Sequence, residues 1–174
     1  MFERFSTTTI KRGLLLFWAL WLTVVVITNL LDALRALELL PASFALASGN
    51  YRWILDTVKP LGLPVWLSST LFAGVIVWEA LAATLFWRAL IRFRDRPMLL
   101  EAAAVTAFVV NLALWAAFQV LDEVVLAFGP EGVHRAIFGN ALLTLLVFYL
   151  LPARSGDGRS SEASRDAASV TPRA

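Results

Sequence analysis

The sequence predicts an all-α polytopic membrane protein: a bundle of four transmembrane helices with a short helical external loop. Three observations support this fold class. Hydrophobic residues make up 59% of the 174 positions and charged residues only 16%, whereas soluble domains are about 45–50% apolar. The apolar residues fall into four long runs that are nearly free of charge. The basic residues cluster beside alternate ends of those runs, as expected for a chain that crosses a bilayer several times.

Each apolar run is long enough to cross a membrane, which takes about 20 helical residues. We expect spans over residues 13–31, 65–87, 102–121 and 130–151. The runs are continuous, whereas the strands of a transmembrane barrel are alternating segments of about 10 residues. Pro130 suits the first turn of the fourth helix. The runs therefore predict helices and not a barrel.

The placement of Lys and Arg predicts the orientation. Most of the 15 basic residues flank the first span on its N-terminal side, follow the second span or follow the fourth. Because positive residues favour the cytoplasmic side, both termini and the second loop are expected in the cytoplasm. The residues on that side are Arg4, Lys11, Arg12, Arg88, Arg92, Arg94, Arg96, Arg154, Arg159, Arg165 and Arg173, against Arg35, Arg52, Lys59 and Arg135 on the other.

The net charge of +2 is small, and the basic residues lie in short clusters beside apolar runs. This pattern indicates topology rather than a phosphate-binding surface, so the lipid bilayer, and not nucleic acid, is the expected partner.

The external loop, residues 32–64, is the largest segment between spans. Its first residues are good helix formers, so we expect the first helix to continue to Pro41. A second short helix is expected over Asn50–Val58, with Asn50 as its cap. The tail, residues 152–174, is rich in Ser, Gly and Arg and has no apolar periodicity, which predicts cytoplasmic disorder.

Glu79 is the one charged residue within the second span. It lies eight residues before Trp87, about 12 Å along the helix. A carboxylate at that depth costs at least a few kcal/mol, so it should face the bundle and be protonated or hydrogen-bonded. Asn111 and Asn140 are expected at similar depth, with Thr144 on the face of Asn140, and these residues could meet Glu79 across the core. Such a cluster is interpreted either as a proton-accepting or ligand-binding site, or as polar contacts that fix helix packing.

A second polar cluster is expected at the external rim of the bundle. One stripe of the third span, which carries Asn111, Trp115, Phe118 and Asp122, would join the two clusters. The rim residues permit a cation or metal site but have no typical metal-ligand spacing, and an acidic rim is also typical of a solvated surface. The rim cluster consists of Asn29, Asp32, Asp122, Glu123 and His134.

Several kinds of chemistry are excluded by composition. The chain has no cysteine, which excludes disulfides, thiolate metal sites and iron–sulfur clusters. Its single histidine excludes a bis-histidine haem. No phosphate loop, nucleophile elbow or dinucleotide fingerprint occurs. No catalytic residue, metal or cofactor is therefore predicted.

Three short motifs stand in the first half of the chain: Asn29 and Asp32 at the end of the first span, Gly49-Asn50 followed by Trp53-Ile54 in the loop, and Trp78-Glu79 in the second span. In these motifs the chain resembles an uncharacterised bacterial family of predicted small four-span integral membrane proteins. The resemblance implies a bacterial inner membrane and no particular activity. It puts forward Asn29, Asp32, Asn50 and Glu79 as positions to test.

Three functional hypotheses follow. The first is a non-enzymatic membrane subunit or scaffold that associates with another membrane protein or with itself. The second is a small proton- or cation-linked transporter or channel that uses Glu79. The third is a membrane enzyme that acts at the external rim, near Asp32, Asp122, Glu123 and His134.

Overall fold

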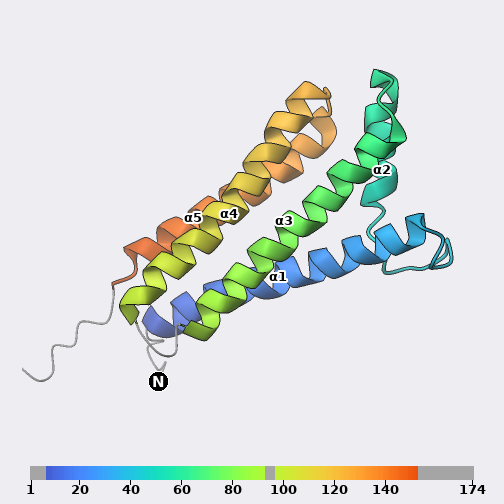
Figure 1. The fold of residues 1–174 in the computed structure, drawn as a ribbon. Helices are drawn as coiled ribbons and strands as arrows, with labels where there is room; N and C mark the ends of the chain where they lie inside the picture. Colours follow the sequence, from blue (N-terminus) through green and yellow to red (C-terminus); the bar gives the residue numbers. More distant parts are fainter. Residues whose placement is uncertain (1–6, 93–96, 153–174) are drawn as a thin grey trace, which may run out of the picture.

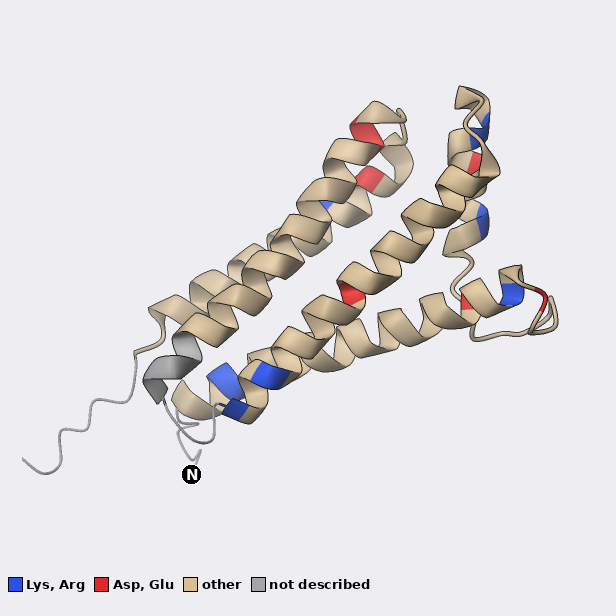
Figure 2. Ribbon diagram, in the orientation of Figure 1, with Lys and Arg blue, Asp and Glu red and all other residues tan. Residues whose placement is uncertain are grey.

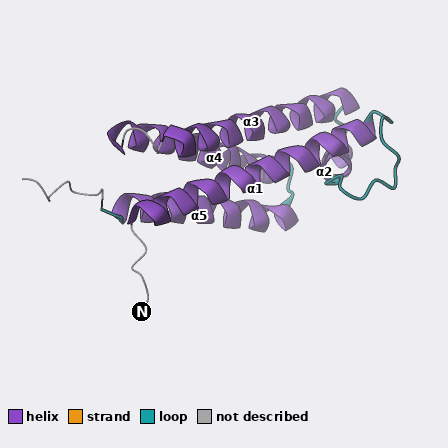
Figure 3. Ribbon diagram, turned by 90° about the horizontal axis from the view of Figure 1, so that it is seen from below, coloured by secondary structure: helices purple, strands orange, loops and turns teal. Residues whose placement is uncertain are grey.

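The computed structural model describes residues 7–92 and 97–152, with the side chains of 97–101 outside the description. The described residues form helices and loops and no strand (Figures 1 and 3). The elements in chain order are α1 (Thr7–Ala36), α2 (Asn50–Val58), the 3-10 helix η1 (Lys59–Leu61), α3 (Val65–Arg92), α4 (Pro97–Val124) and α5 (Phe128–Leu150).

The four long helices are each long and apolar enough to cross a membrane. The all-α fold class and the bundle of four long helices are therefore confirmed, and the chain is a multi-pass membrane protein. Each helix contains one predicted span, with the exception of the last residue of the fourth, Leu151. Large apolar side chains such as Phe17, Val77 and Leu143 are more than half exposed on the outer faces of the helices, where hydrocarbon, and not water, is their solvent.

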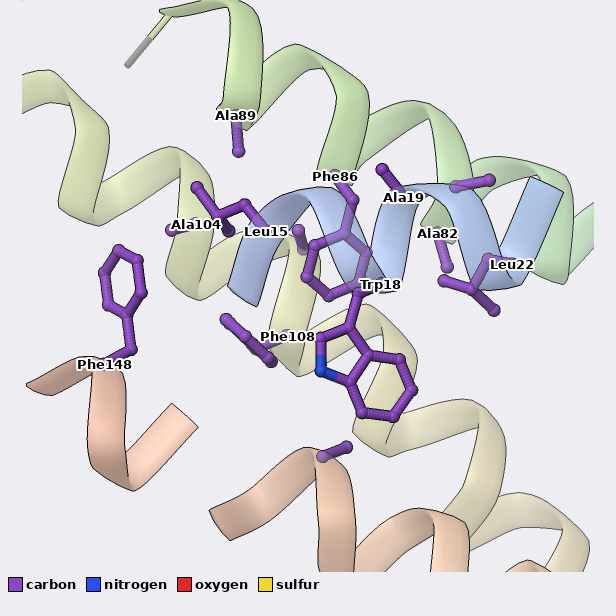
Figure 4. Packing of buried hydrophobic residues seen from close by; sticks show 13 residues of the cluster. Leu15, Trp18, Ala19, Leu22, Ala82, Phe86, Ala89, Ala104, Phe108 and Phe148 are labelled. Carbon is purple, nitrogen blue, oxygen red and sulfur yellow. The ribbon is translucent and has the colours of Figure 1, made fainter. Parts of the chain in front are cut away.

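The core of the bundle is a row of aromatic rings that crosses the four long helices (Figure 4). Trp18 of α1 stacks on Phe86 of α3 with ring centroids 6.2 Å apart. Phe86 meets Phe108 of α4 edge-on at 5.0 Å, and Phe108 lies 6.2 Å from Phe148 of α5. The ammonium of Lys11, on α1, lies 4.8 Å from the ring centroid of Phe148. This contact brings α5 back to α1 and closes the bundle at one end.

Small residues surround these rings and let the helices approach closely. Ala19, Ala82, Ala104 and Ala141, one from each long helix, are fully buried. Close backbone approach matters in a membrane, because lipid tails are as apolar as the side chains and packing itself drives helix association. The core is therefore tight where the four helices meet.

The bundle has two chemically different ends (Figure 2). The terminal end holds the start of α1 and the final turns of α3 and α5. Among the described side chains it carries Lys and Arg without Asp or Glu, whereas the loop end, with α2 and the α4–α5 turn, carries both signs of charge. A single acidic position, Glu79, lies in the middle of α3. This contrast is the structural counterpart of the charge pattern in the sequence.

The prediction that α1 continues to Pro41 is wrong, because the helix ends at Ala36. Glu38 takes a left-handed conformation with φ of 60°. The amide of Leu39 then donates to the carbonyl oxygen of Leu34 at 2.9 Å, which closes the last turn of the helix. Good helix formers are therefore not enough to extend α1, because the turn reverses the chain toward α2.

The short helix α2 has the predicted bounds, but Asn50 does not cap it. Gly49 occupies the cap position with φ of 82°, a left-handed conformation that favours glycine. No side-chain capping bond is made there. The tail predicted to be disordered lies, apart from Pro152, outside the described residues.

Candidate functional site

A cavity of about 240 Å³ lies in the half of the bundle nearer the loop end. All five α-helices contribute to its wall, because the helices pack tightly at the aromatic core and leave space beyond it. Most of its wall is aromatic or aliphatic, and its polar lining residues are two asparagines, one glutamate and one histidine. The lining residues are Trp21, Val25, Asn29, Asn50, Trp53, Ile54, Phe72, Val75, Glu79, Trp115, Phe118, Val133, His134 and Ile137.

A chain of side-chain hydrogen bonds leads from the short helix to the buried carboxylate. Asn50 of α2 donates from Nδ2 to Oδ1 of Asn29 on α1 at 2.8 Å. Asn29 donates in turn from Nδ2 to Oε2 of Glu79 on α3 at 2.8 Å. Asn29 and Glu79 are only 1% and 2% exposed. This network satisfies one carboxylate oxygen in a place where an unpaired charge would be costly.

Asp32, one turn after Asn29, holds the start of α2 to the end of α1. Its Oδ1 accepts from Nη2 of Arg35 at 2.6 Å. Its Oδ2 accepts from the backbone N–H of Tyr51 at 2.8 Å and from Oγ of Ser48 at 3.2 Å. A carboxylate from another helix thus satisfies a free N–H in the first turn of α2, where negative charge is favoured. Asp32 is a structural anchor for the loop between α1 and α3.

Asp122 and His134 form a second polar pair, on α4 and α5. Oδ2 of Asp122 lies 2.6 Å from Nδ1 of His134, across the short turn that joins the two helices. The imidazole also stacks on Phe118, with ring centroids 4.5 Å apart. A carboxylate at Nδ1 fixes the orientation of the ring. His134 therefore presents a fixed ring to the cavity.

The structure does not bring Asn140 to Glu79, which corrects the expected intramembrane cluster. The side chain of Asn140 is exposed on α5, and Thr144 donates to the backbone oxygen of Asn140. The inward stripe of α5 consists of Ile137, Ala141 and Phe148, spaced four and seven residues apart. Because a helix turns about 100° per residue, Asn140 lies beside that stripe and not on it. The depth of Asn140 along α5 followed from the sequence, but the direction in which its side chain points did not.

Asn111 is fully buried on α4 as expected, yet its partner is on its own helix. Its Oδ1 accepts from Nε1 of Trp115 at 3.0 Å. Its Nδ2 finds no acceptor among the described residues. Asn111 therefore orients Trp115, a wall residue of the cavity, and does not line the cavity itself.

The rim cluster is divided between two places. Asn29 and Asp32 lie on the α1–α2 side, Asp122 and His134 lie on the α4–α5 side, and Glu123 is exposed. Within residues 7–92 and 97–152, no three His, Asp or Glu residues converge to hold a metal ion. The cation or metal site that the rim cluster permitted is therefore not assembled.

Sequence reasoning missed the part that α1 and α2 play in the wall. Trp21, Val25 and Asn29 recur every four residues on α1, so this spacing was a usable signal for one inward face. Trp53 of α2 also lines the cavity. The position of α2 depends on the hydrogen bond from Asn50 to Asn29, and no local sequence pattern indicates that bond.

Comparison with protein-family models, curated proteins and solved structures finds no match for this chain. The resemblance noted in the sequence therefore stays a prediction. The four positions that it puts forward, Asn29, Asp32, Asn50 and Glu79, lie in neighbouring hydrogen-bonded networks where α1, α2 and α3 meet.

Proposed function

We propose that this chain is a small membrane transport protein in which Glu79 binds the transported ion or ligand. The observation that carries the proposal is that a buried carboxylate in the middle of a membrane-spanning helix lines a cavity built by all five helices. Ionisable residues inside a membrane typically face a bundle interior and mark ion or substrate pathways. A residue that served packing alone would not need a cavity beside it.

The test is proton flux in liposomes that hold the purified protein and a trapped pH-sensitive dye, under an imposed potassium diffusion potential. We expect flux above that of empty liposomes, and we expect Glu79→Gln to abolish the excess. Glutamine has nearly the same shape, and its oxygen still accepts from Asn29 Nδ2, so the fold is retained. The matched control is Glu123→Gln, at an exposed position outside the cavity, which should keep the flux. Equal flux in the wild type and Glu79→Gln would overturn the proposal.

A second candidate function, self-association, is supported by the exposed amide of Asn140. Asn140 lies 10 residues before the end of α5, about 15 Å at 1.5 Å per residue. No hydrogen bond of its side chain is found within the described residues. Gly132 and Ala136 share its face at four-residue spacing and are also exposed, which permits close approach of a second helix. An amide both donates and accepts, so two copies related by a twofold axis can pair Asn140 with itself.

The oligomeric state in lipid nanodiscs or mild detergent tests self-association. We expect a dimer for the wild type and a monomer for Asn140→Leu, while Leu142→Ala, on the same helix, should leave the dimer. A wild-type monomer at all accessible concentrations, or a dimer that Asn140→Leu does not weaken, counts against it. The enzyme hypothesis is not carried forward, because Asp32 is bonded at the α1–α2 side of the bundle whereas Asp122 and His134 pair at the α4–α5 side.

We further propose a bacterial inner-membrane location with both termini in the cytoplasm. The bacterial inner membrane is what the family resemblance implies, and the orientation is supported by the Lys and Arg residues at the terminal end, since positive charge favours the cytoplasmic side. Alkaline phosphatase fused after residue 174 tests the orientation, because it needs disulfides that form only outside the cytoplasm. We expect an inactive fusion there and an active fusion within loop residues 42–47. The reverse pattern would refute the orientation.

A further inference from the structure

We infer that the cavity takes a small organic cation, with its ammonium group at Glu79 and its apolar body against the aromatic wall. This inference rests on the proposed function and names the class of ligand. It is argued from the charge of the lining residues, from the chemistry of the walls and from the size of the space.

The charge of the lining favours a cation. Glu79 is the only acidic residue in the wall, and none of the lining residues from the described part of the chain is Lys or Arg. The nearby guanidinium of Arg35 is already paired with Asp32. A carboxylate offers about four acceptor sites, and Asn29 fills one of them. Glu79 therefore has acceptor capacity left, and a ligand ammonium supplies both donors and the opposite charge.

The walls select an organic cation over a bare metal ion. Hard metal cations need six or more oxygen ligands at short distance. The cavity instead presents the rings of three tryptophans and two phenylalanines, Trp21, Trp53, Phe72, Trp115 and Phe118. Ring faces attract ammonium groups within about 6 Å. Trp21 and Trp115 pack against each other with ring centroids 5.8 Å apart and form a continuous aromatic wall, beside which an ammonium group at Glu79 would lie.

The volume sets the size of the ligand. About 240 Å³ corresponds to the space of about eight water molecules at roughly 30 Å³ each. A smaller hollow of about 80 Å³ adjoins it and shares Trp53, Ile54, Val75 and Phe118 with the cavity. Its other lining residues are apolar except Thr57 and Asp122, and Asp122 is paired with His134, so the hollow suits the hydrocarbon part of the ligand. A simple arylalkyl ammonium ion fits this combination of size and polarity.

The test is calorimetric titration of the full-length protein in nanodiscs of neutral phosphatidylcholine, which do not attract cations themselves. The probes are 2-phenylethylammonium, the neutral 2-phenylethanol and the anionic 3-phenylpropanoate, which share one body and differ in charge. We expect the ammonium probe to bind most tightly and the anion not to bind. Glu79→Gln should weaken the ammonium probe at least about tenfold, while Glu123→Gln should leave its affinity unchanged. Trp53→Leu, on the surface helix α2, should weaken it about two- to fivefold through the lost ring face.

Each outcome decides the inference separately from the proposed function. If the alcohol or the anion binds as tightly as the ammonium probe, or if Glu79→Gln binds the ammonium probe as the wild type does, the inferred ligand class is wrong. Absence of any ammonium binding to the wild type also overturns it. The proton flux of the wild type and Glu79→Gln is measured without these probes, so that flux can still support the transport proposal when the ligand class fails. If the wild type shows neither ammonium binding nor proton flux that depends on Glu79, both the ligand class and the transport proposal are wrong.

Discussion

Asn29 donates a hydrogen bond from Nδ2 to Oε2 of Glu79 at 2.8 Å and joins α1 to α3 halfway along the bundle. The same asparagine accepts from Asn50, so the short helix α2 is linked to the buried carboxylate through one amide. A single residue thus serves both the packing of two membrane helices and the position of the loop.

Replacement of Asn29 by leucine, of similar size, should destabilise the bundle by about 1–3 kcal/mol. The reason is that Glu79 stays buried and loses the donor that satisfies it. Thermal unfolding in detergent, followed by circular dichroism, measures the change. Thr28→Ala is the control, because that hydroxyl bonds only within its own helix, to Val25 O. Equal unfolding temperatures for Asn29→Leu and the wild type would show that the bond contributes nothing.

Removal of the Asn50 side chain should loosen α2 without unfolding the bundle. Asn50→Ala deletes one part-buried hydrogen bond, worth about 1 kcal/mol, so amide hydrogen exchange over residues 50–58 should speed up about fivefold. Exchange in the middle of α3 and α4 should not change. Arg52→Ala removes only an exposed ion pair with Asp56, and little effect is expected from it. Exchange that rises equally in all helices would contradict the local role of Asn50.

Asp32→Ala should make the loop between α1 and α2, residues 37–49, more mobile. Three donors converge on this carboxylate, and it is 2% exposed, so we expect a loss of at least about 2 kcal/mol. Limited proteolysis within residues 37–49 should become faster in the variant. Asp56→Ala, at an exposed position on α2, gives the comparison. A loop that resists protease equally in both variants would mean that Asp32 does not anchor it.

Truncation of a ring in the aromatic core should cost less free energy of unfolding than it does in a water-soluble protein. Phe108→Ala removes a fully buried ring, yet lipid is as apolar as the core. The cost should therefore fall below the about 3–5 kcal/mol seen in water-soluble proteins, since lost packing contributes and transfer from water does not. Phe17→Ala, at a lipid-facing position, should cost less still. Unfolding in mixed detergents measures both, and equal costs would contradict the assignment of core and lipid faces.

The fold was predictable because a helix that crosses hydrocarbon must be long and apolar, and because a charge within it is costly. Runs of about 20 apolar residues gave the four spans, and the burial of Glu79 followed from the cost of a charge in lipid. The identity of its partner did not follow. Asn29 and Glu79 meet only because α1 packs against α3 at that height, and no local pattern encodes how two helices are rotated about their axes.

Asn140 illustrates the limit on the other helix. Residue spacing tells which side chains share a face of α5, but both of its faces are apolar: Ile137 and Ala141 turn inward, while Leu142 and Leu143 turn outward. Hydrophobic periodicity therefore gives no inward direction. The cavity was unpredictable for a related reason, since it depends on ring sizes and on where four helices diverge.

The central claim is that the space beside Glu79 is open to water-soluble molecules, although it lies within the membrane-spanning bundle. Because the chain has no cysteine, single-cysteine variants give an unambiguous readout. Val75→Cys lies on the cavity wall, whereas Val77→Cys, two residues along the same helix, lies on the outer face of the bundle, where the native side chain is 69% exposed.

The decisive measurement is the labelling rate of these two variants in liposomes with a charged, water-soluble thiol reagent, which reacts with the thiolate and so requires water. We expect Val75→Cys to react and Val77→Cys to resist. If neither residue reacts, or if Val77→Cys reacts as fast as Val75→Cys, there is no water-filled site at Glu79.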